Sequence, residues 1–144
     1  MIRWILIITT FFLLGSCSVN PEPLVAGKDQ CYSCKMPVAD TRYGAEIVTL
    51  KGKIFKFDDI ACLLEYQNSE MIKQEEIFSI LVSDYQNGEE LLNVTSACFL
   101  ISEQLKTPMN SQTVAFADCK IAESFLNTFT GKLVSWDELS QRQK

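Results

Sequence analysis

The chain has 144 residues, of which 47% are apolar and 22% charged, with a net charge of −5 and six cysteines. This length suits one compact unit or two small halves that share a core, and the acidic balance gives no electrostatic basis for binding nucleic acid. The sequence contains no histidine, which excludes imidazole as a metal ligand, as a general base and as the partner of a catalytic serine or cysteine.

Residues 1–16 have the features of a lipoprotein signal peptide. Arg3 precedes an apolar run over residues 4–14, which is too short to span a bilayer and is typical of a signal sequence. We expect Cys17 to be lipidated after cleavage, because the run ends in a lipobox-like Leu14-Gly15-Ser16-Cys17. The alternative is an ordinary secretory signal. A lipid anchor would hold the protein on the extracytoplasmic, periplasmic side of a membrane, and Ser18 after the cysteine favours the outer membrane.

A tether is expected over residues 17–30, beginning with the lipid anchor, because this stretch contains two prolines and a glycine and has no periodicity. A first β-β-α-β unit is expected over residues 31–85. Residues 44–50 and 54–57 have the pattern of a β-hairpin. Asp58 or Asp59 would cap a helix, whose apolar face includes Ile60, Leu63 and Leu64, and residues 75–84 would form the third strand.

The second half, residues 86–144, repeats this order of elements. Strands are expected at residues 95–101 and 113–116, followed by a helix from Asp118, a strand at 132–136 and a short tail helix. The sequence therefore predicts an α+β fold in which two small β-β-α-β units pack together, because each is too small to bury a core alone.

The sulfur-rich segment Cys31-Tyr32-Ser33-Cys34-Lys35-Met36-Pro37 carries the chemistry of the chain. Thiolate and thioether are soft donors that suit Cu(I). Cys34 and Met36 are two residues apart and can point to the same side of an extended segment. A third donor must come from elsewhere, and Met109 in a polar, proline-containing loop is the best candidate, although a methionine can also fill a gap in a core.

The remaining cysteines have plainer interpretations. Cys31 is either a further soft ligand or one half of a disulfide with Cys34 or another cysteine. Cys62 and Cys98 lie within a predicted helix and strand, where a free cysteine is most often a small buried apolar residue. Cys119 begins the second predicted helix, whose dipole can lower the pKa of a thiol.

The Cys31-x-x-Cys34-x-Met36 motif, the hairpin ending in Phe57-Asp58-Asp59 and the late Pro108-Met109 resemble the NosL family of lipoprotein copper chaperones over roughly residues 17–137. The resemblance implies a pair of β-β-α-β units, no enzymatic activity, and Cu(I) held by Cys34, Met36 and Met109. It also implies delivery of copper to an apo-enzyme, nitrous oxide reductase, or to its maturation transporter. The family usually has Gly where this chain has Lys35.

Three other functions fit the cysteines less well, one of which is an anchored structural lipoprotein with disulfides and no metal. A structural zinc site could use Cys31, Cys34 and Cys62 with Cys98 or Cys119, but the second pair lacks the usual spacing. A thiol–disulfide redox lipoprotein would place its Cys-x-x-Cys between a strand and a helix, whereas Pro37 and a loop follow here.

Overall fold

The computed structural model describes residues 19–142. The predicted signal peptide and the predicted lipidation site Cys17 lie outside these residues. Within residues 19–142, no helix has both the length and the apolar character needed to cross a membrane.

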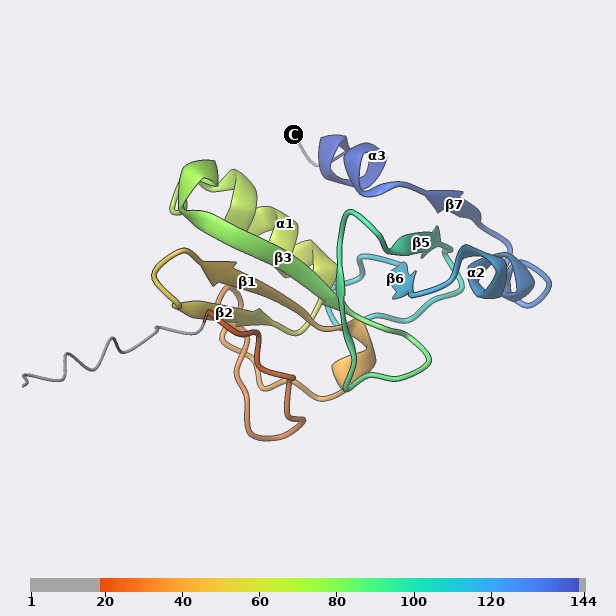
Figure 1. The fold of residues 1–144 in the computed structure, drawn as a ribbon. Helices are drawn as coiled ribbons and strands as arrows, with labels where there is room; N and C mark the ends of the chain where they lie inside the picture. Colours follow the sequence, from red (N-terminus) through yellow and green to blue (C-terminus); the bar gives the residue numbers. More distant parts are fainter. Residues whose placement is uncertain (1–18, 143–144) are drawn as a thin grey trace, which may run out of the picture.

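The first half of the fold is a four-stranded antiparallel sheet with one helix (Figure 1). Its strands occur in the order β2-β1-β3-β4. The predicted hairpin is present, as is the predicted helix, which Asp59 caps by accepting a hydrogen bond from the backbone N–H of Ala61. The strand β4 was not predicted, because three residues are too few to form a pattern. The elements are the 3₁₀ turn η1 (Thr41–Tyr43), β1 (Ala45–Thr49), β2 (Ile54–Phe57), α1 (Ile60–Asn68), the 3₁₀ turn η2 (Gln74–Glu76), β3 (Ile77–Ser83) and β4 (Leu91–Asn93).

The second half contains a three-stranded sheet in the order β6-β5-β7. In both halves the first strand lies between the second and the third, as β1 does between β2 and β3. The small sheets with their helices confirm the predicted α+β class. The elements are β5 (Cys98–Ile101), β6 (Thr113–Phe116), α2 (Cys119–Phe125), β7 (Lys132–Val134) and α3 (Trp136–Gln141).

The strand β5 begins three residues later than predicted. Asn93 accounts for the difference, because its side chain accepts hydrogen bonds from the backbone and hydroxyl of Thr95, while its carbonyl accepts from the backbone of Ser96 and Ala97. These bonds hold residues 93–97 in a turn, which is the usual effect of an asparagine side chain on nearby backbone.

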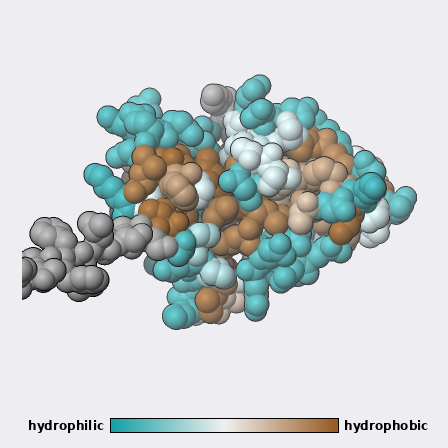
Figure 2. All heavy atoms as spheres, viewed as in Figure 1, coloured by the Kyte–Doolittle hydropathy of each residue, from teal (hydrophilic) through white to brown (hydrophobic). Residues whose placement is uncertain are grey.

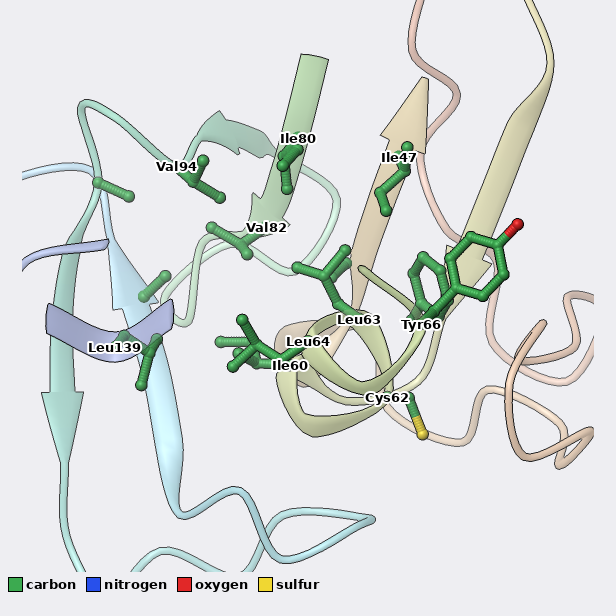
Figure 3. Packing of buried hydrophobic residues seen from close by; sticks show 14 of the residues in the cluster. Ile47, Ile60, Cys62, Leu63, Leu64, Tyr66, Ile80, Val82, Val94 and Leu139 are labelled. Atoms are coloured by element: carbon green, nitrogen blue, oxygen red, sulfur yellow. The ribbon is translucent and has the colours of Figure 1, made fainter. Parts of the chain in front are cut away.

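Helix α1 lies at the centre of the main core. Leu63 points toward Ile47 and Ile80 of the first sheet, whereas Ile60 and Leu64 point toward Leu139 of α3 (Figure 3). The helix therefore joins the two halves, while a second cluster, which includes Phe116 and Ala122, packs under α2. Apolar residues gather over the middle of the face shown in Figure 2, with hydrophilic side chains around its edges.

The packed part of the chain begins earlier than the predicted tether allows. Leu24 is buried, the backbone N–H of Glu22 donates to Oε1 of Glu46, and that of Gly27 donates to the carbonyl of Val38. No local pattern predicts these contacts, because a proline-rich segment packs without a regular period. Residues 22–30 therefore belong to the folded body.

Candidate metal centre

The Cys31–Met36 segment forms a tight loop. The backbone N–H of Cys31 donates to the carbonyl of Met36 at 2.8 Å, and that of Lys35 donates to the carbonyl of Cys31 at 3.0 Å. Lys35 has a φ of +65°, a left-handed conformation that favours glycine. Its ammonium group bonds to the carbonyl of Tyr32 and lies 4.2 Å from the centre of the Tyr32 ring. These contacts hold the loop closed despite the unfavourable backbone angle.

The loop is fixed against the first sheet by Tyr32. Its backbone N–H donates to the carbonyl of Lys56 in β2 at 2.7 Å, and its ring packs edge-on against Phe55 and Tyr66. Because α1 begins just after β2 ends, this attachment brings the loop to the first turn of the helix.

Four side chains converge there to form a cluster of possible metal ligands. One ligand atom from each of Cys31, Cys34, Asp58 and Cys62 lies within 4.8 Å of the others. Two come from the loop, Asp58 follows β2, and Cys62 lies in the first turn of α1, where its sulfur points away from the sheet and Leu63 (Figure 3). Sγ of Cys34 donates to Oδ1 of Asp58 at 3.6 Å. We call these four residues the thiol cluster.

The thiol cluster is mostly shielded from solvent. Cys31, Cys62 and Asp58 are buried, with at most 2% of their surface exposed, whereas Cys34 is only partly buried. A hydrogen bond from the Cys62 thiol lowers the pKa of Cys31 and correspondingly raises that of Cys62. Burial raises the pKa of Cys34. Cys31 is thus the thiol in the group that most readily becomes a thiolate, the form that binds metals.

The two predicted thioether ligands are exposed. Met36 is 54% and Met109 is 40% exposed, so neither fills a gap in the core. The backbone N–H of Met109 donates to Oδ2 of Asp59 at 2.7 Å, and Asp59 adjoins Asp58 of the thiol cluster. Asp59 therefore caps α1 with one oxygen and holds the Met109 loop at the same end of the helix with the other.

The structure corrects the interpretation of Cys98 and Cys119. They form a disulfide with a Cα–Cα distance of 5.2 Å, so Cys98 is not a free buried residue and Cys119 is not a free thiol. Residues 98 and 119 are far apart in the sequence and meet because β5 pairs with β6, which leads into α2. Neither cysteine is available as the fourth ligand of the predicted zinc alternative.

Cys31, Cys34 and Cys62 are free. The sequence-based zinc alternative already grouped Cys31, Cys34 and Cys62, whereas Asp58 was expected only as a possible helix cap. The i, i+4 spacing of Asp58 and Cys62 across the helix start was a usable signal, because it places both side chains at one end of α1.

Comparisons with known proteins agree with this fold. The family model for NosL matches residues 24–143. This chain belongs to the NosL family. Among solved structures, it is similar to the crystal structure of the copper chaperone NosL from Shewanella denitrificans. That match has a TM-score of 0.66 and 21% sequence identity, and it covers 83% of this chain and 96% of the other. No match was found among curated proteins.

Within the NosL fold, the thiol cluster occupies the junction between the Cys-x-x-Cys loop and the start of α1. This junction combines three free thiols and a carboxylate within 4.8 Å of one another, and the neighbouring Asp59 holds the backbone of the Met109 loop. Such a donor set suits a soft metal ion.

Proposed function

We propose that this protein is a metallochaperone that binds Cu(I) as cargo and delivers it to a copper enzyme outside the cytoplasm. The observation that carries the proposal is the convergence of three free thiols at one end of α1, in a chain without histidine. Sulfur donors favour Cu(I) over harder ions, and membership of the NosL family agrees with carriage of copper rather than catalysis.

The cargo ligands that we propose are Cys34, Met36 and Met109, with Cys31 as an additional sulfur nearby. Cys34 is the least buried thiol of the cluster, and both thioethers are exposed. A partner can therefore approach the ion from the solvent side and take it by ligand exchange. Thioethers are neutral and carry no proton, so their release does not depend on pH.

Anchoring through a lipid on Cys17 is part of this proposal. Contacts with the folded body begin at Glu22, so a fully extended linker from Cys17 would span only about 17 Å. The copper site would then stay close to the extracytoplasmic face of the membrane, with the outer membrane favoured. We propose nitrous oxide reductase, or its maturation transporter, as the acceptor.

Zinc is the second candidate cargo, because three thiols and one carboxylate within 4.8 Å can supply a tetrahedral site. A thiol–disulfide oxidoreductase is less well supported. Its reactive thiol should be accessible, whereas Cys31, the thiol with the lowered pKa, is fully buried.

The test is metal analysis of the reduced full-length protein after exposure to Cu(I) and to Zn(II), followed by passage over a chelating column. We expect one retained Cu(I), and loss of retention in Cys34→Ser and Met36→Leu. Met71→Leu is the matched control, because Met71 is also exposed, at 66%, but lies outside the proposed site. Retention of zinc alone, or unchanged copper retention in Met36→Leu, would refute the proposal.

A further inference from the structure

The thiol cluster contains more thiols than the proposed Cu(I) site uses. Cys31 and Cys62 are 0% and 1% exposed, so they are poorly placed to hand an ion to a partner. They are also free, although Cys98 and Cys119 of the same chain form a disulfide. A buried pair of neighbouring thiols that is not needed for exchange can instead supply electrons.

Asp58 is the second unusual feature of the cluster. It is a hard oxygen donor among soft sulfurs, it is 2% exposed, and it accepts a hydrogen bond from Cys34. A carboxylate adds little to a Cu(I) site, whereas Cu(II) prefers oxygen and nitrogen ligands. Asp58 and Cys34 together therefore offer Cu(II) a first binding position at the partly exposed side of the cluster.

We propose that Cys31 and Cys62 reduce Cu(II) that enters at Asp58 and Cys34, so that the protein produces the Cu(I) that it carries. This inference rests on the proposed function. In the overall step, two S–H bonds break and one S–S bond forms between Cys31 and Cys62. Two Cu(II) ions, reduced in turn, each take one electron, and two protons leave to solvent.

The geometry favours this pair over the alternatives. The two sulfurs are among the four ligand atoms that lie within 4.8 Å of one another, and both side chains are buried. A disulfide needs the sulfurs to approach to about 2.05 Å, from a separation that is at most 4.8 Å in this structure. Cys34 would stay reduced, and the Cu(I) product could pass from it to Met36 and Met109.

The test uses full-length protein whose free thiols have been reduced and from which the reductant has been removed without oxygen. Cu(II) sulfate is added, Cu(I) is measured with a chromophoric Cu(I) chelator, and new disulfides are mapped by mass spectrometry of unreduced peptides. We expect two Cu(I) for each new Cys31–Cys62 disulfide, with Cys34 still open to alkylation. The Cys62→Ser variant should lose the reduction but retain Cu(I) supplied as Cu(I), because Cys62 is not among the proposed cargo ligands.

Each other outcome has a clear meaning. Failure of the wild type to retain supplied Cu(I) refutes the proposed function. Retention of supplied Cu(I) without any reduction of Cu(II) overturns only the present inference. A Cys31–Cys34 disulfide, or dimers linked through Cys34, also overturns this inference. Both products are mapped in the wild-type protein, so this result does not depend on whether a variant folds. Loss of supplied Cu(I) by a folded Cys62→Ser variant would identify Cys62 as a ligand and overturn its role as a reductant.

Discussion

Asp59 holds the proposed copper site together, and substitutions there separate its two roles. Its side chain is fully buried, with Oδ1 accepting from the backbone N–H of Ala61 at 2.9 Å and Oδ2 accepting from that of Met109 at 2.7 Å. Loss of a helix cap costs about 1 kcal/mol, and loss of a hydrogen bond to a charged acceptor costs about 2 kcal/mol. We therefore expect Asp59→Ala to lower the free energy of unfolding by about 3 kcal/mol.

Asp59→Asn is the more informative change. Its single carbonyl oxygen can cap α1, but its amide group then faces the N–H of Met109, so that two donors meet. We expect a loss of about 2 kcal/mol, together with weaker Cu(I) binding because the Met109 loop is no longer held. Urea unfolding of the copper-free protein measures the first effect, and competition with a Cu(I) chelator measures the second.

The matched control is Asp118, which caps α2 by accepting from the backbone N–H of Lys120 at 2.8 Å and is exposed. Asp118→Ala should cost about 1 kcal/mol and leave Cu(I) affinity unchanged. If Asp59→Asn binds Cu(I) as tightly as the wild type, the contact between Asp59 and the Met109 backbone does not position Met109 for copper binding. That result would refute this reasoning.

Three further predictions concern the rest of the fold. Lys35→Gly should be more stable than Lys35→Ala by about 1 kcal/mol, because both lose the lysine contacts and only glycine relieves the positive φ; equal urea midpoints would contradict this. The Cys98→Ser/Cys119→Ser variant should lose about 3 kcal/mol, since the disulfide closes a loop of 21 residues, and a fall in its Cu(I) retention would be inconsistent with a purely structural disulfide. Burial raises the pKa of Glu46 to about 7, so its contribution to stability is complete below the unfolded pKa of about 4.3 and is lost as the pH rises through 7. Glu46→Gln should remove this decline when unfolding is measured at pH 5 and pH 8, and an unchanged decline would refute the assignment.

Local patterns predicted much of the fold. The β1–β2 hairpin, the Asp59 and Asp118 caps and strand β6 (Thr113–Phe116) follow from alternation, turn residues and capping chemistry, which act over short distances in the sequence. The contacts of residues 22–30 with the sheet and the short strand β4 could not be predicted in this way, because they depend on tertiary packing rather than on a local period.

In the candidate site, too, local patterns predicted some residues, while others depend on tertiary packing. The soft-donor motif pointed to Cys34 and Met36, whereas the approach of Cys62 and Asp58 depends on how Tyr32 attaches the loop to β2. The Cys98–Cys119 disulfide likewise requires the pairing of β5 with β6. The ligand set of Cys34, Met36 and Met109 remains a prediction.

X-ray absorption at the copper edge of Cu(I)-loaded protein tests the central claim most directly, with the methionines replaced by selenomethionine. If Met36 and Met109 bind the ion beside Cys34, the first shell will contain sulfur and selenium and no oxygen or nitrogen. Met36→Leu and Met109→Leu will each remove part of the selenium signal, while Met71→Leu will leave it intact. A first shell without selenium would contradict the account.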